Sequence, residues 1–353
     1  MNNDLSSYFE DPEFKEALEK YEGMVKNHTP AYFDADELTD IAEYYASKGR
    51  QIEAEAAIDF ALQLHPNDTD ALIFRARSLA MKGRLDEAYM VMDLIEDRSD
   101  REVRFLKADL LMEEKRMEEA DHVFEELAAY EEGKLETLID IILAYIDANQ
   151  EALAKKWIKH VGETYDLASL SQKNQKFRDL LCDFYITFNN PEAAIPLLQA
   201  TLDCYPYSIN HWNSLGKCYL STNDYEEAHE AIDFALAIDD SNAEALTLKA
   251  FCYQQSGELQ KSCDYYLRLA EQQENKTRAY LALAKTYFEM QDYTSSIYYI
   301  EALLDNKDAL SKYELSELYG DIALCHAALK HIGVGQASIR RSLELNELSL
   351  IHI

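Results

Sequence analysis

Apolar and small residues recur along the chain at helical spacing, in pairs of short segments separated by turn residues. The clearest pair carries one apolar face on each segment: Trp212, Leu215, Gly216 and Tyr219, then Ala228, Ile232 and Ala235. Spacings of three and four residues place each set on one side of a helix. Asn223 and Asp224 lie between the two sets and are typical of a turn. The pattern predicts two helices joined by a tight turn, with Gly216 and Ala228 small enough for the helices to approach closely.

The same pattern recurs 34 residues apart, from Cys182 to Gly216 and from Gly216 to Ala250. A fixed period of this length is typical of repeat proteins. We predict nine units: residues 35–68, 69–100, 101–134, 135–168, 175–208, 209–242, 243–276, 277–310 and 318–351. Residues 169–174 and 311–317 interrupt the period as short insertions, either extended helix ends or turns between helices. The turn of the last unit is ambiguous, because Gly333 and Gly335 both compete for it.

This pattern resembles the tetratricopeptide repeat, whose motif W-x2-L-G-x2-Y…A-x3-F…P begins here at Trp212, with Ile232 in place of Phe and Asp240 in place of Pro. The resemblance implies an all-α fold, a right-handed α-α superhelix of about nine helix-turn-helix repeats. We expect repeats one to four over residues 35–168, repeats five to eight over 175–310, and an atypical C-terminal repeat or cap over 318–353. Residues 11–27 predict an amphipathic helix beginning at Asp11 and Pro12, and we expect residues 1–34 to cap the array.

Composition and charge narrow the functional class. The 353 residues are 48% hydrophobic, with 10 Gly and 6 Pro, which favours a folded helical protein over a disordered acidic chain. The formal net charge of −32, concentrated before residue 168, disfavours nucleic acid and anionic membrane surfaces as partners. The first residues show no secretory signal, and no apolar run is long enough for a membrane span, so we expect a cytoplasmic protein.

The cysteines support the same compartment. All six lie in the C-terminal half without a CxxC pair: Cys182, Cys204, Cys218, Cys252, Cys263 and Cys325. Isolated thiols of this kind are typical of core residues in a reducing cytoplasm. A disulfide framework is the alternative.

The resemblance implies that the first helix of each unit lines a concave surface that holds proteins or peptides. The repeat phase assigns these residues to it: Asp36, Asp40, Glu43, Asp70, Phe105, Asp109, Ile139, Asp140, Leu143, Ile146, Asp179, Asp183, Lys217, Phe251, Lys285 and Phe288. They suggest a groove that is acidic at its start, apolar in the fourth unit and more basic at its end. A partner segment that is basic or carries apolar anchors suits such a groove. The alternative is an ordinary solvated acidic surface, with Ile139, Leu143 and Ile146 covered by a neighbouring helix.

Chemical motifs are sparse. There is no phosphate-binding glycine loop, and the histidines show no zinc-site spacing, so we expect no cofactor and no metal. His122 and His326 are more typical of surface or packed residues than of ligands. The Lys217, Arg278 and Lys285 pattern lacks the asparagines of family members that clamp the acidic tails of chaperones. The residues outside the repeats are too few for a catalytic domain.

The sequence therefore predicts a non-enzymatic scaffold or adaptor that binds proteins or peptides. Two alternatives stay open. One is a self-assembling repeat protein, with homodimers formed through array ends at Leu345, Leu348, Leu350 and Ile351. The other is a peptide-sensing regulatory subunit.

Overall fold

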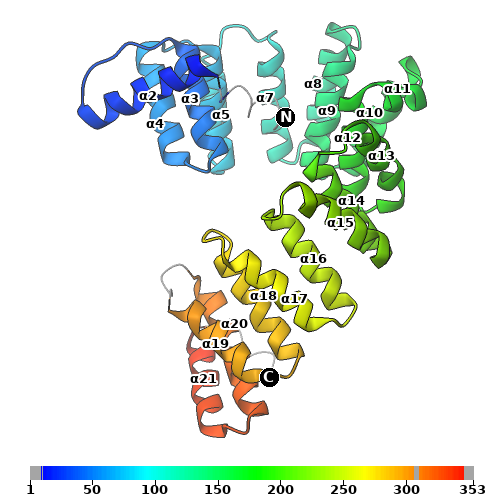
Figure 1. The fold of residues 1–353 in the computed structure, drawn as a ribbon. Coiled ribbons are helices and arrows are strands. Elements are labelled where there is room, and N and C mark those ends of the chain that lie inside the picture. The colour runs from blue at the N-terminus through cyan, green and yellow to red at the C-terminus, as the bar shows by residue number, and fades with distance from the viewer. Residues whose placement is uncertain (1–8, 10, 306–309, 346–353) are drawn as a thin grey trace. The chain divides into compact units, whose positions relative to one another are not determined.

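The structure is a computed structural model that describes residue 9, residues 11–305 and residues 310–345. Within these residues the regular structure consists of twenty α-helices and no strand, which confirms the predicted all-α fold class (Figure 1). The chain divides into two compact units, residues 1–164 and residues 165–353.

Unit 1 contains α2 (Pro12–Asn27), α3 (Ala35–Ser47), α4 (Gln51–Leu64), α5 (Thr69–Met81), α6 (Leu85–Met92), α7 (Arg101–Glu113), α8 (Met117–Tyr130), α9 (Leu135–Asp147) and α10 (Glu151–Thr164). Unit 2 contains α11 (Leu167–Lys173), α12 (Gln175–Thr187), α13 (Pro191–Cys204), α14 (Ile209–Thr222), α15 (Tyr225–Ile238), α16 (Ala243–Gln255), α17 (Leu259–Ala270), α18 (Lys276–Glu289), α19 (Tyr293–Leu304), α20 (Lys312–Ala328) and α21 (Ile332–Leu345). Apart from α2 and α11, consecutive helices form contacting pairs, from α3 with α4 to α20 with α21.

Every one of these nine pairs, within the described residues, turns in the same way. The first helix is followed by a residue with φ between 53° and 76°: Gly49, Gly83, Lys115, Asn149, Asn189, Asn223, Gly257, Gln291 and Lys330. The next backbone N–H donates back to the helix, as Arg50 N does to Tyr45 O and Asp224 N does to Tyr219 O, both at 2.8 Å. This closure satisfies a carbonyl that the helix end leaves without a partner. The turn of the last pair falls at Lys330, so Gly333 and Gly335 lie inside α21.

Small residues allow the helices of a pair to pack closely, as the sequence pattern predicts. A methyl group added at Gly216 on α14 would lie only 2.7 Å from Ile232 Cγ1 on α15. Ala228 and Ile232 are fully buried beside this contact. The glycine is therefore required for the distance between α14 and α15.

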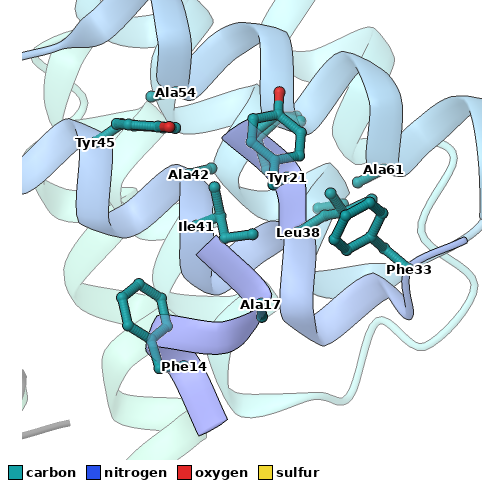
Figure 2. Packing of buried hydrophobic residues seen from close by; sticks show 13 residues of the cluster. Phe14, Ala17, Tyr21, Phe33, Leu38, Ile41, Ala42, Tyr45, Ala54 and Ala61 are labelled. Atoms are coloured by element: carbon teal, nitrogen blue, oxygen red, sulfur yellow. The ribbon is translucent and has the colours of Figure 1, made fainter. Parts of the chain in front are cut away.

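The N-terminal helix α2 packs against α3. Asp11 is its N-cap and accepts from Glu13 N at 2.8 Å, and Pro12 occupies the first helical position, as predicted. Phe14, Ala17 and Tyr21 lie along one side of α2 and join a buried cluster with residues of α3 and α4 (Figure 2). Burial of a large apolar side chain contributes about 1.5–3 kcal/mol. This helix therefore covers apolar surface of the first pair.

A partly buried carboxylate joins α8, α9 and α10. Asp121 accepts hydrogen bonds from Tyr145 Oη at 3.0 Å, from Trp157 Nε1 at 2.9 Å and from Lys156 Nζ at 2.5 Å. Burial alone raises the pKa of Asp121, but these three donors outweigh it and hold the pKa below its usual value. The ionised form is thus the one that the fold stabilises.

The two predicted insertions are helical except at Asn174 and Ser311, which precede α12 and α20. Residues 169–173 belong to α11, and the buried Arg178 fixes the end of that helix. Arg178 donates to Thr201 Oγ1 at 2.7 Å and to the carbonyls of Ser171 and Gln172 at 3.1 and 3.2 Å. Residues 312–317 form the first turns of α20, which begins with a capping box between Ser311 and Glu314. The extra residues extend helical structure rather than interrupting it.

All six cysteines are free thiols, five of them buried and Cys204 exposed. Burial raises the pKa of the Cys182 thiol to about 12 and that of Cys218 to about 11. A thiol with a raised pKa is a poor nucleophile, so these side chains act as packing residues.

Candidate functional site

The acidic residues predicted on the first helices of unit 1 come together in the structure. We name this surface the acidic first-helix face; it consists of the predicted Asp36, Asp40 and Glu43 on α3, Asp70 on α5, Asp109 on α7 and Asp140 on α9, together with Glu102 on α7. Burial raises the pKa of Glu43, and repulsion from Asp40, Asp70 and Glu102 raises it further against the opposing field of Arg77. Carboxylates from three helices therefore act on one another.

Two arginines lie within this face and link its helices. Arg77 on α5 approaches Glu102 at 3.4 Å and Asp109 at 3.6 Å, both on α7. Arg101 on α7 pairs with Glu102 at 2.8 Å and contacts Asp140 on α9. These two cations face seven carboxylates, so they organise the surface without neutralising it.

Several carboxyl groups of this face have raised pKa values. Burial is the main cause that raises the pKa of Asp109, to about 6, and Arg77 only partly opposes it. Burial and then the neighbouring Asp68 and Asp36 raise the pKa of Asp70. The pKa of Asp140 is also raised by burial despite the Arg101 contact. An added positive charge would relieve this repulsion.

The apolar centre expected in the fourth unit is not an open surface. Ile139 and Ile146 are only 6% and 5% exposed, and Leu143 is half-buried. Phe105 is 7% exposed, because its ring packs on Phe124 at 5.2 Å. The prediction of an apolar stretch in the groove is therefore wrong. These side chains belong to the core, as the alternative of a covering neighbouring helix had it.

In unit 2 two of the predicted charged residues, Lys217 and Asp179, have partners of opposite or hydrogen-bonding character. Lys217 on α14 forms an ion pair with Glu244 at the start of α16, so it does not make this end basic. Asp179 accepts from His211 Nε2 at 3.3 Å if that nitrogen is protonated. Asp183 is exposed. Sequence reasoning missed Glu244, although its place in the first turn of the following first helix was available from the repeat phase.

Lys285 and Phe288 do come together, at a pocket of about 210 Å³ formed by α18, α19 and α20. Asp321 lines the same pocket, and Lys285 lowers the pKa of this carboxyl against the larger effect of burial, which raises it. Phe288 is 38% exposed and Phe251, on α16, is 41% exposed. These are the exposed apolar side chains among the predicted residues.

A family profile described as the tetratricopeptide repeat matches residues 39–89 and 213–277, which contain the helix pairs around Ala42 and Gly216. These parts of the chain contain tetratricopeptide repeats. Its fold is similar to the C-terminal part of a tetratricopeptide-repeat-containing protein from Cytophaga hutchinsonii, with a TM-score of 0.53 and 18% identity, covering 69% of this chain and 96% of that one.

Two further proteins are similar to parts of this chain. A tetratricopeptide-repeat protein from Parabacteroides merdae has a TM-score of 0.45 and 16% identity, covering 71% of this chain and 98% of that one. The formate-dependent nitrite reductase complex subunit NrfG of Escherichia coli O157:H7 is 26% identical over 191 residues, which are 52% of this chain and 89% of that protein. The tetratricopeptide repeats in the chain support a role in protein interaction.

In the described part of the chain, no three or more His, Cys, Asp or Glu side chains are placed to hold a metal ion. Over those residues, every helix is too short or too polar to cross a membrane. Leu348, Leu350 and Ile351, predicted to mediate self-assembly, lie outside the described residues, and Leu345 is the last residue of α21.

Proposed function

We propose that this tetratricopeptide-repeat protein is a non-enzymatic scaffold that binds a basic segment of a partner protein on the acidic first-helix face of unit 1. The observation that carries the proposal is a set of seven carboxylates on four first helices, three of which contact Arg77 or Arg101. NrfG, a similar protein, is a subunit of an enzyme complex, which is consistent with a scaffold role.

Charge is the reason for a basic partner. Glu43, Asp70, Asp109 and Asp140 are partly out of water in the folded protein, and each is repelled by neighbouring carboxylates, Glu102 among them in every case. A lysine or arginine placed among them gains attraction from several carboxylates at once, while the cost of desolvating those carboxylates has already been met in folding. Arg77 and Arg101 keep the carboxylates in position between helices.

The partner segment is recognised mainly through its charges. Phe105, Ile139 and Ile146 are buried, so this face offers few apolar anchoring positions. Binding that depends on charge is fast and sensitive to salt, and it selects against acidic partners.

The test compares two variants with the same net charge. The first, Glu43→Gln/Asp70→Asn/Asp109→Asn, removes three carboxylates from the face. The control, Asp86→Asn/Glu96→Gln/Glu118→Gln, removes three exposed carboxylates from the second helices and their loops. The probe is a fluorescein-labelled peptide of alternating lysine and serine, measured by fluorescence anisotropy.

We expect the first variant to bind the peptide about tenfold more weakly and the control to bind within about twofold of the unmodified protein. Equal weakening of both variants would mean that the peptide responds only to net charge, and the proposal would be wrong. Circular dichroism checks that both variants remain helical.

A further inference from the structure

A second surface, in unit 2, has the features of a binding groove. An open groove of about 490 Å³ runs between the second helices α13 and α15, with α14 as its floor. Trp212 on α14 and Phe234 on α15 stack there with ring centroids 4.6 Å apart and planes 18° from parallel. Trp212 Nε1 donates to Pro206 O at 2.8 Å, which fixes the indole ring. Phe234 is 53% exposed, so this aromatic pair is open to solvent.

The borders of this groove are acidic. Asp203 lies on the α13 side, and Glu227 and Glu230 lie on the α15 side. Among the described residues that line it there is no lysine, arginine or histidine. A surface of aromatic rings bordered by three carboxylates favours a cation with an apolar or planar body.

Equivalent grooves in unit 1 already contain such a cation. The groove between α4 and α6 repeats the same positions, with Pro66 for Pro206, Glu87 for Glu227 and Leu94 for Phe234. Arg75 occupies the floor position of Leu215 there, and it pairs with Asp59 on α4. In the groove between α6 and α8, Lys107 has that position.

The next repeat of unit 2 shows how a cation is held at this position. Lys249, one repeat after Leu215, is buried. Its Nζ lies 2.6 Å from Asp233 Oδ1, 3.2 Å from His229 O and 5.6 Å from the centre of the Tyr253 ring. The fold therefore accommodates a positive side chain between an acid and an aromatic ring at this level of the helix pair.

We propose that the groove between α13 and α15 binds an arginine side chain of a partner protein. Leu215 stands where Arg75, Lys107 and Lys249 supply a cation in three other repeats, and the groove around it carries the Trp212–Phe234 pair and three carboxylates. A guanidinium suits the site better than an ammonium, because its plane stacks on aromatic rings and its N–H groups pair with a carboxylate in a fork. This inference concerns unit 2 and does not depend on the function proposed for unit 1.

The test uses the two tryptophans of the intact chain, labelled as 5-fluorotryptophan and observed by fluorine NMR. Trp157 is buried in unit 1 and serves as the internal reference, and a Trp157→Phe variant assigns the two signals. The probes are the amidated and acetylated tripeptides Leu-Arg-Leu, Leu-Lys-Leu and Leu-citrulline-Leu, which differ at the central side chain.

We expect the arginine peptide to shift the Trp212 signal with saturation and to leave the Trp157 signal in place. The lysine peptide should bind several-fold more weakly, and the uncharged citrulline peptide at least about tenfold more weakly. The variant Glu227→Gln/Glu230→Gln should weaken arginine binding at least about fivefold. Its control, Glu226→Gln/Asp240→Asn, removes two exposed carboxylates outside the groove and should not change it.

Three results would overturn the proposal: no saturable shift of the Trp212 signal, equal binding of the arginine peptide and either other peptide, or equal weakening by both double variants. These results are separate from the test of unit 1, because the readout is local to Trp212.

Discussion

Replacing Gly216 by alanine tests whether the contact between α14 and α15 is set by the glycine. The added methyl group would lie 2.7 Å from Ile232 Cγ1, whereas carbon atoms in contact prefer about 3.5–4.0 Å. Ile232 is fully buried, so it has little room to move. The helices must separate or the isoleucine must leave its preferred rotamer.

The magnitude follows from two opposing effects. Overpacking of a well-packed core costs about 1–3 kcal/mol. Replacing glycine by alanine inside a helix contributes about 1 kcal/mol in the opposite direction. We therefore expect Gly216→Ala to lower the free energy of unfolding by about 1 kcal/mol.

Gly320 provides a matched control in the same unit. It lies inside α20, and the nearest atom to its added methyl group is Ser342 Oγ at 3.8 Å, an ordinary contact. Gly320→Ala should therefore raise the free energy of unfolding by about 0.5–1 kcal/mol. The two identical substitutions are expected to have opposite signs.

The assay is urea unfolding of the full chain followed by circular dichroism, with amide hydrogen exchange of α14 and α15, because repeat proteins can unfold in parts. Ile232→Ala supplies a second background. There the added methyl group meets no isoleucine, so Gly216→Ala should become stabilising by about 1 kcal/mol. If Gly216→Ala stabilises the otherwise unmodified protein as much as Gly320→Ala does, the distance between α14 and α15 does not require a glycine at position 216.

Three further outcomes are expected. Asp121→Ala should lower the free energy of unfolding by about 2–4 kcal/mol in urea titrations, because the buried indole and phenol donors lose their acceptor. Asp121→Asn keeps an acceptor oxygen and should lower it less. An equal loss of stability in the two variants would contradict this reasoning. Arg178→Met should speed amide exchange in α11 about tenfold or more while α15 is unchanged, because the end of α11 loses its hydrogen bonds; unaltered exchange in α11 would refute the role of the guanidinium. The lysine-serine peptide should bind more tightly as pH rises from about 5 to 7 and then level off, because a bound cation favours ionised Asp109, whose pKa is about 6 in the free protein. In anisotropy titrations Asp109→Asn should flatten this rise.

Local patterns in the sequence were sufficient for the paired helices and for most of their turns. The apolar period predicts these helices, and turn residues such as Asn223 and Gly49 mark the reversals, because both depend on neighbours within a few residues. The helix α11 and the turn at Lys330 were decided by the structure. The close approach of the two helices at Gly216 could also be predicted, because the second helix of the pair follows directly in the sequence. The acidic residues of the first-helix face were found in the same way, from the phase of the repeat.

The partners of individual side chains depended on tertiary structure. Phe105 and Ile139 share the repeat phase of exposed residues, yet packing against other helices buries them. The sequence predicts Lys217 as a cation of the groove, whereas in the structure it forms an ion pair with Glu244 on α16.

The same holds for the groove beside Trp212, which exists only because two second helices flank the helix between them. The sequence by itself determined which face of each helix is apolar or charged, because that follows from helical periodicity. Which of those faces stay open, and which charges remain uncompensated, was decided by the contacts between helices.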